Sequence, residues 1–215
     1  MTSFDSLDGL SASVNVKEPS KGLFHLIKSL GYVDPINSGI VQVFQSSTYY
    51  GRKTASSLIY WNDSVGWASY GGIGQNFELF YPNLYIELTG YSFRSVDYDD
   101  NIPRNWQVTC SDGTMLHDVV NNKTLCNGVT GYGNSCGFID EKAFYTTKVI
   151  KCKRLKFAIS GVESSNYYHF VLSGIELFGS LSSSLCNKNN QKCTHKCNHE
   201  SIVNAFIVFL LVANR

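Results

Sequence analysis

The sequence lacks an excess of charge of either sign. Its 215 residues carry 18 Lys and Arg against 17 Asp and Glu, and the formal net charge is +1. Charged residues make up only 16% of the chain. A nucleic-acid or anionic-membrane partner held by bulk electrostatics needs a strong excess of basic residues. The composition therefore argues against both partners, and no nucleic-acid ligand is expected.

A leading apolar run is also missing from the first twenty residues, so no secretory signal peptide is visible. Together with an odd count of seven cysteines, this predicts a cytoplasmic protein with free thiols. Glycosylation sequons at 62–64 and 122–124 support the alternative of a cell-surface protein. Cys126 and Cys136 are either a disulfide or two free thiols, and Cys110 is expected to be a small inward hydrophobe.

Motifs of catalysis are absent as well. The sequence contains no G-x-S-x-G, no G-x-x-x-x-G-K-[ST] and no H-E-x-x-H. Asp112, His117 and Asp118 lie close in sequence but have no placed nucleophile, and His169 is expected to be a satisfied rim or core histidine. We predict that the protein is not an enzyme.

Aromatic residues and glycine are abundant instead. The chain holds 13 Tyr, 13 Phe and 3 Trp, with 18 Gly. Such a composition with few charges favours pleated sheets joined by turns over helix bundles. The length suffices for one well-buried core and is too short for two domains of ordinary size. The composition therefore predicts one all-β domain.

One short helix is expected before the sheets. Residues 1–21 contain sparse apolar residues and predict a disordered lead-in. In residues 23–30 apolar side chains recur at helical spacing, and Gly31 suits a C-terminal stop. The spacing predicts a helix of about two turns that packs on the core as an end plug.

Period-two alternation of apolar and polar residues indicates strands in the middle of the chain. It runs through 40–47, 84–96 and 105–114, where Asp112-Gly113 gives the strongest hairpin signal. A further strand is expected at 153–160.

The apolar stretch 166–180, which holds one carboxylate, is expected to run back beside 153–160 after a turn. Two such neighbours with apolar inner faces need a second sheet about 10 Å away. Short strands separated by turn signals are typical of a sandwich or barrel. The pattern therefore predicts that the stretch 166–180 is buried against its own domain.

Six short segments occur in the order and spacing of a known family. They are SGIVQVFQSSTYYG, GWAS, LYIELTGYSFRS, RNWQVTCSDGTML, KCKRLKF and SGIELFGS, over about residues 38–180. In these segments the chain resembles discoidin domains (coagulation factor 5/8 type C domains), closest to the discoidin-like domains of single-celled eukaryotes. The resemblance implies an eight-stranded antiparallel, jelly-roll-like β-sandwich. It also implies a non-catalytic domain that binds glycans, lipid headgroups or proteins through loops at one end.

The chain departs from this family in two places. Extracellular members commonly tie the two ends of the domain with a disulfide, and no cysteine precedes Cys110, so that staple is missing. Ala158 stands where a basic residue is frequent, so any role of that position is not carried over. With the leading helix, the domain is expected over 22–181, followed by a poorly ordered Cys/His-containing tail at 182–215.

Candidate binding residues lie in three loops, at 47–53, 60–67 and 97–102. Exposed aromatic faces stack on sugar rings, and nearby carboxylates and amides bind hydroxyls. The resemblance places the first of these loops at the ligand-facing end. The alternative is that the rings pack against the rim of the sandwich. The candidate ligand-binding residues are Tyr49, Tyr50, Arg52, Tyr60, Trp61, Asp63, Tyr98, Asp99 and Asp100.

Two charged clusters have simpler interpretations than a ligand site. Asp97, Asp99 and Asp100 are oxygen donors for Ca²⁺, but three carboxylates are too few, so a solvated acidic turn is expected. The basic segment 148–156 is accompanied by no aromatic platform and is expected to be the solvated outer face of a strand. No cofactor is predicted.

The tail combines zinc-type ligands with an apolar segment. As a helix, residues 202–213 would span about 18 Å, short of a hydrocarbon core of ~30 Å. Association of this segment with a membrane surface stays open. The spacing of the zinc-type ligands matches no zinc finger, so no metal is predicted; they are Cys186, Cys193, His195, Cys197 and His199.

The sequence thus predicts a non-catalytic recognition module that binds a glycan or a protein ligand through loops at one end of a β-sandwich, with cell adhesion as one role. The alternative is an intracellular protein-interaction or scaffold domain without sugar affinity. A membrane-tethered adhesin is a third interpretation.

Overall fold

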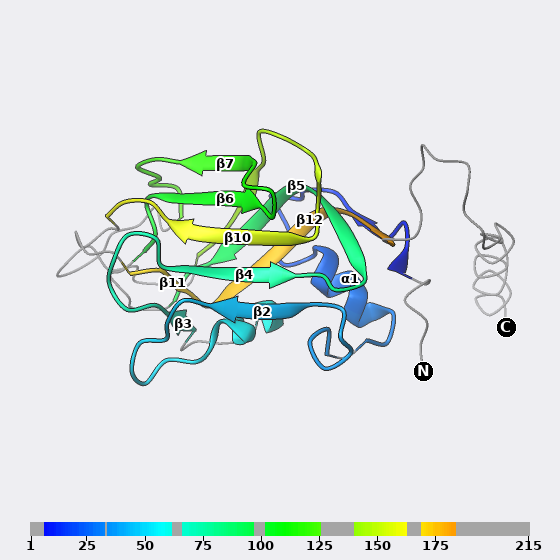
Figure 1. The fold of residues 1–215 in the computed structure, drawn as a ribbon, viewed down its shortest axis with the longest axis horizontal. Helices are drawn as coiled ribbons and strands as arrows, with labels where there is room; N and C mark the ends of the chain where they lie inside the picture. Colours follow the sequence, from blue (N-terminus) through cyan, green and yellow to red (C-terminus); the bar gives the residue numbers. More distant parts are fainter. Residues whose placement is uncertain are drawn as a thin grey trace, which may run out of the picture. The chain divides into compact units, whose positions relative to one another are not determined.

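Two stacked antiparallel sheets form the domain (Figure 1). The computed structural model describes residues 7–32, 34–61, 66–96, 102–125, 140–162 and 169–183. The strand order of the sheet that we name the β5 sheet is β1 (Ser11–Ala12), β12 (Gly174–Ser183), β5 (Leu84–Arg94) and β8 (Glu141–Tyr145), with β9 (Lys151–Cys152) also paired to β5. The order of the β10 sheet is β2 (Gln42–Gln45), β4 (Asn76–Phe80), β10 (Arg154–Ile159), β6 (Trp106–Cys110) and β7 (Met115–Val119). A two-stranded pair joins β3 (Trp67–Ala68) to β11 (Val171–Leu172). The predicted all-β sandwich is confirmed.

Alternation along each strand places the core between the sheets. In β6 the side chains of Trp106, Val108 and Cys110 are buried while the two residues between them are partly exposed. Phe77 and Phe157 stack across neighbouring strands, with ring centroids 4.9 Å apart. Aromatic pairs of this kind contribute about 0.5–1.5 kcal/mol each beyond the burial of their area. The period-two pattern therefore identified the buried faces correctly.

A buried polar bridge joins the sheets within this aromatic core. The indole N–H of Trp106 donates to the hydroxyl of Tyr91 at 2.7 Å, and that hydroxyl lies 2.9 Å from Nδ1 of His117. Since the hydroxyl oxygen accepts from Trp106, its proton is available to the Nδ1 lone pair of a neutral His117. Burial lowers the pKa of His117, which favours this neutral form.

Strand β12 has a different partner from the one the sequence predicts. It pairs with β5 and β1, whereas β10 lies in the opposite sheet. The expectation that 166–180 runs back beside 153–160 is therefore wrong. Alternation shows which side of a strand faces the core, but it does not distinguish a neighbour in the same sheet from one across the core. Residues Gly174–Gly179 are all buried, because the second face of β12 is covered by α1 (Leu23–Ser29) and the 3₁₀ helix η2 (Ala55–Tyr60).

The one carboxylate of β12, Glu176, holds the helix. Its two oxygens accept the backbone N–H groups of Gly22, Phe24 and His25 at 2.6, 3.0 and 2.9 Å. These are unpaired N–H groups of the first helical turn, which need acceptors when buried. Glu176 is only 2% exposed, and burial raises its pKa to about 8 against the opposing effect of the three N–H bonds. The expected end-plug helix is thus present and anchored.

The predicted lead-in also belongs to the fold. Residues 7–21 are not a disordered segment, because Leu7 is buried and β1 pairs with the edge of β12. Sparse apolar residues concealed this, since two ladder residues and one leucine suffice to dock a short segment. The chain divides into Met1–Ser183 and Ser184–Arg215. The second unit contains most of the predicted tail and lies outside the described residues.

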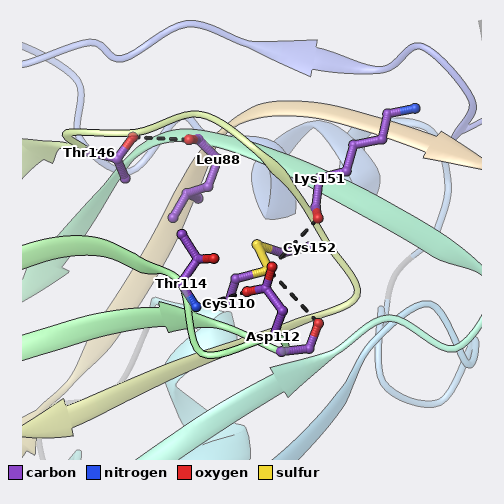
Figure 2. Close-up of a disulfide and its surroundings, with 8 residues drawn as sticks. Leu88, Cys110, Asp112, Thr114, Thr146, Lys151 and Cys152 are labelled. Carbon is purple, nitrogen blue, oxygen red and sulfur yellow. Dashed lines mark hydrogen bonds between the residues drawn. A yellow bond between two sulfur atoms is a disulfide. The ribbon is translucent and has the colours of Figure 1, made fainter. Parts of the chain in front are cut away.

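A disulfide links the two sheets. Cys110 at the end of β6 is bonded to Cys152 of β9, 42 residues later, with their Cα atoms 5.4 Å apart (Figure 2). Cys110 faces inward as predicted, but the expectation that it is a free thiol is wrong. The hairpin beside it also follows the prediction, since Gly113 has a φ of 85° and the backbone N–H of Thr114 donates to the Asp112 carboxylate at 2.8 Å (Figure 2). Within the described segments, no helix is long and apolar enough to cross a membrane.

Candidate functional site

One end of the sandwich carries most of the candidate residues. At this end β2 and β10 finish and β4 and β6 begin, as the pairing of Gln45 with Phe77 and of Ile159 with Trp106 shows. The loop after β2 and the loop before β4 therefore leave the β10 sheet side by side. We call this the loop end. The opposite end carries the β6–β7 hairpin and the disulfide.

Side-chain hydrogen bonds fix the two loops to each other. The hydroxyls of Ser46 and Ser47 both donate to the side-chain oxygen of Gln75, at 2.5 and 2.6 Å. The Ser47 hydroxyl also accepts the backbone N–H of Tyr70 at 3.0 Å, and its carbonyl accepts the indole N–H of Trp67 at 3.0 Å. The QSS segment that carries the family resemblance is thus the frame of the site.

On this frame stands a group of side chains that we call the Tyr49 cluster: the rings of Tyr49, Tyr70 and His169 are in contact, and Tyr50 follows Tyr49 in the same loop. The ring centroid of Tyr49 lies 5.4 Å from that of Tyr70 and 5.7 Å from that of His169. Tyr49 is 46% exposed, Tyr70 49% and Tyr50 90%. Three large aromatic side chains that are between 46% and 90% exposed within one loop group are unusual for a rim whose rings pack inward.

His169 has a defined orientation in the cluster. Its Nδ1 lies 3.0 Å from the carbonyl oxygen of Ser69, which can only accept, so Nδ1 carries the proton and Nε2 is the acceptor in the neutral ring. The Ser69 hydroxyl in turn accepts the N–H of Phe170 at 2.9 Å. The ring also lies beside Gly71, where an added Cβ would stand 3.5 Å from Cε1. The expected rim histidine is therefore held by β3 and β11.

Two predicted aromatic ligands are instead used in packing. Burial raises the pKa of Tyr60 to about 12, its hydroxyl donates to Asp34, and Lys28 lies over its ring at 5.4 Å. Trp61 donates its indole N–H to Glu141 at 3.0 Å, and its ring covers the backbone at Gly174, where a Cβ would lie 2.8 Å from Cε3. For these two residues the alternative of packing on the rim describes the structure.

The remaining predicted residues divide into two groups. Arg52 is partly exposed at the edge of the Tyr49 cluster, and its backbone N–H donates to the Tyr49 carbonyl at 3.1 Å. Asp63, the acidic loop 97–101 and Cys126 to Cys136 lie outside the described residues. The described segments contain no group of three or more His, Cys, Asp or Glu side chains arranged to hold a metal ion.

Sequence reasoning missed Tyr70 as a site residue and treated His169 only as a satisfied histidine. Tyr70 precedes Gly71-Gly72, and an aromatic residue beside a Gly pair is a usable signal for an exposed turn. His169 is about a hundred residues away and meets Tyr70 through the pairing of β3 with β11. Nothing in either local sequence indicates that pairing.

The basic segment 148–156 does have aromatic neighbours, contrary to the sequence analysis. The guanidinium of Arg154 lies 5.2 Å from the ring centre of Phe44 and 4.9 Å from that of Phe80, and it pairs with Glu78 at 2.8 Å. These rings come from β2 and β4, so no local pattern reveals them. Because Arg154 is already paired and stacked, it belongs to the surface of the β10 sheet and does not compete as a phosphate site.

Comparison with known proteins gives low-identity similarities. No model of a protein family matches the chain, and no curated protein matches it. It is similar to the family 32 carbohydrate-binding module of Clostridium perfringens NanJ in complex with galactose, with 11% identity over 66% of this chain and 94% of that one and a TM-score of 0.46. A fucolectin from the serum of striped bass, Morone saxatilis, matches with 9% identity, 66% and 47% coverage and a TM-score of 0.47.

A chitosan-binding module from Paenibacillus sp. IK-5 in complex with chitotriose matches with 14% identity, 65% and 97% coverage and a TM-score of 0.46. Similarity at this level identifies no ligand for the present chain. The assignment of the fold rests on the two sheets themselves, which form the antiparallel β-sandwich that the resemblance to discoidin domains implies.

Proposed function

We propose that this protein is a non-catalytic recognition module that binds a glycan through the Tyr49 cluster. The observation that carries the proposal is the exposure of Tyr49 and Tyr70, whose ring centroids lie 5.4 Å apart with the ring planes tilted by 59°, on a hydrogen-bonded frame. Exposed aromatic faces held in place offer a platform for the C–H face of a sugar at low entropic cost.

Polar side chains also stand beside the rings. His169 is fixed by the bond of its Nδ1 to the Ser69 carbonyl, and Arg52 is partly exposed in the same loop as Tyr49. The hydroxyls of Ser46 and Ser47 donate to Gln75, so their role is to hold the loops that carry the rings. A few fixed polar groups around an apolar face are the usual composition of a small-ligand site.

Buried positions of the titratable groups support a non-catalytic role. Among the described residues, the Tyr91 hydroxyl bonded to His117 is the arrangement closest to an activated nucleophile; Tyr91 is completely buried, whereas His117 is partly exposed. A substrate atom cannot reach the Tyr91 hydroxyl without opening the core, and burial holds the pKa of Tyr91 far above its ordinary value.

A glycan array tests the proposal directly. The labelled full chain should give a saturable signal on at least one glycan class, and Tyr50→Ala or Tyr70→Ala should weaken it while thermal unfolding stays unchanged. Tyr145→Ala is the matched control, because Tyr145 is 60% exposed but lies on β8, away from the cluster. An array with no signal for the folded wild type contradicts the glycan ligand.

The alternative is a protein ligand at the same surface, either on a cell surface in adhesion or inside the cell on a scaffold. Ile73 favours it, because this exposed aliphatic residue lies in the loop of Tyr70 and offers no hydrogen bond to a sugar. An Ile73→Ser variant separates the two: glycan binding should survive it, whereas a protein interface centred on this loop should weaken.

A further inference from the structure

We propose that Asn122 is a site of N-linked glycosylation and that the domain matures in an oxidising secretory compartment. Two independent features carry this inference: the disulfide between the sheets and the geometry of the sequon at 122–124. Neither depends on the ligand of the Tyr49 cluster.

The disulfide connects the two sheets across the core of the fold. Cys110 comes from the β10 sheet and Cys152 from the β5 sheet, and Cys152 is completely buried. Their Cα separation of 5.4 Å lies within the range that a disulfide requires. Structural disulfides of this kind persist in secreted and cell-surface proteins and are rare in a reducing cytosol.

Asn122 is partly exposed and lies in a turn shortly after the edge strand β7, with its backbone bonded to Arg104. Its side-chain oxygen accepts the backbone N–H groups of Thr124 and Leu125 at 3.0 and 3.2 Å, and the Thr124 hydroxyl at 3.3 Å. In the described part of the chain, its Nδ2 donates no hydrogen bond. The hydrogen bonds of the turn therefore involve only the side-chain oxygen of Asn122, and its side-chain nitrogen, which a glycosyl transfer needs, takes no part in them.

The neighbourhood of Asn122 has room for a large substituent. Lys123 and Thr124 are exposed, and Val120 on the other side of the turn is 73% exposed. Among the described strands β7 pairs with β6 alone, and on its other side Thr147 donates its backbone N–H and its hydroxyl to the Leu116 carbonyl, nearer to the hairpin than to the turn. The exposed residues that surround Asn122 leave space for a glycan on the solvent side of the turn.

The reaction is an ordinary group transfer. Nδ2 forms a bond to C1 of the first sugar of a lipid-linked oligosaccharide, the bond from C1 to the lipid pyrophosphate breaks, and the nitrogen loses one proton.

Asn122 and the Tyr49 cluster lie at the same end of the sandwich but at opposite edges of the β10 sheet. Four strand spacings separate these edges, about 19 Å, so the point of attachment lies away from the aromatic rings.

Peptide mapping of the full chain from its native cells tests both features together. The protein is purified without reductant, free thiols are alkylated, and a peptide N-glycosidase is applied in heavy-oxygen water. We expect Asn122 to appear as heavy-oxygen-labelled aspartate only after the glycosidase, and the peptides of Cys110 and Cys152 to stay linked until reduction. An unmodified Asn122 overturns the glycosylation site, and alkylation of Cys110 before reduction overturns the oxidising compartment.

Variants in the same cells separate the sequon from the fold. Asn122→Gln and Thr124→Ala should each lower the apparent mass on a gel by that of one glycan, since transfer requires both the amide of Asn122 and the hydroxyl of Thr124. Lys123→Ala and Thr124→Ser should leave mobility unchanged, because both keep the sequon. Identical mobility of Thr124→Ala and the wild type would contradict the proposal even where Asn122→Gln disturbs the turn.

Discussion

The two ends of the sandwich are built from different kinds of interaction. At the loop end, Ser46, Ser47 and Gln75 join the loops through side-chain hydrogen bonds and leave aromatic faces in solvent. At the opposite end, a tight turn at Asp112-Gly113 and the Cys110–Cys152 bond close the structure. The contrast indicates that one end stabilises the fold and the other is available for recognition.

Removal of the disulfide should give the largest effect on this contrast. A crosslink that closes a loop of 42 residues is expected to stabilise the protein by about 4 kcal/mol through the entropy of the unfolded chain. The Cys110→Ser/Cys152→Ser double variant should lose that amount in urea denaturation while its ligand affinity at the loop end stays unchanged. Equal loss of stability and affinity would show that the two ends are coupled.

The region between the two ends can be tested through the pH dependence of stability that Glu176 causes. Its pKa is raised to about 8 from an ordinary value of 4.5, so the folded state holds this proton more tightly than the unfolded state. This stabilising contribution is fully present below pH 4.5 and is lost as the pH rises through 8.

Glu176→Gln should flatten that decline and cost about 1–3 kcal/mol at pH 6, because one helix N–H loses its acceptor. Denaturant titrations of both proteins from pH 4.5 to 8.5 measure the difference. His117, whose pKa is lowered by burial, destabilises the fold as the pH falls below 6.5 in both proteins, so its opposite contribution cancels. Parallel pH profiles would contradict the assignment to Glu176.

Tyr70→Ala should reverse the pattern of the disulfide variant. Loss of one face of the aromatic pair is worth about 0.5–1.5 kcal/mol, which predicts roughly tenfold weaker binding of the glycan with the strongest array signal. Stability should change little, because the ring is half exposed. Titration calorimetry against that glycan, with Tyr145→Ala beside it, is the measurement; a matching loss in the control would remove the cluster from consideration.

The smallest expected effect concerns the frame beneath the rings. Ser47→Ala deletes the hydrogen bonds to Gln75 and to the N–H of Tyr70, at a cost of about 1 kcal/mol in unfolding free energy. Affinity should fall several-fold because Tyr70 loses its fixed position. Ser29→Ala removes one exposed hydroxyl bond on α1 and should leave affinity intact. Unchanged binding by Ser47→Ala would show that the loops hold their positions without this frame.

Local pattern sufficed for single elements of the fold. The alternation of Trp106, Val108 and Cys110 predicted β6, and Asp112-Gly113 predicted its hairpin, because burial and turn conformation are properties of neighbouring residues. The placement of β12 failed because alternation is the same for a strand beside β10 and one facing it.

The candidate site was predictable only in part, for the same reason. Tyr49 and Tyr50 were found because they follow a strand end in an aromatic loop. Tyr60 and Trp61 have the same local signature, yet Asp34 and Glu141 engage them from distant parts of the chain. The disulfide was missed because inward alternation at Cys110 does not identify the residue across the core.

The anchoring of α1 on Glu176 has a consequence for where the domain is cut. A shortened protein that starts at residue 38, where the discoidin-like segments begin, would lose α1 together with the three N–H donors of the Glu176 carboxylate, and part of the covered face of β12 would be exposed. It would also expose the edge of β12 that β1 covers, a template for association with other chains. Aggregation of such a truncated protein would reflect a misplaced boundary and would say nothing against the fold.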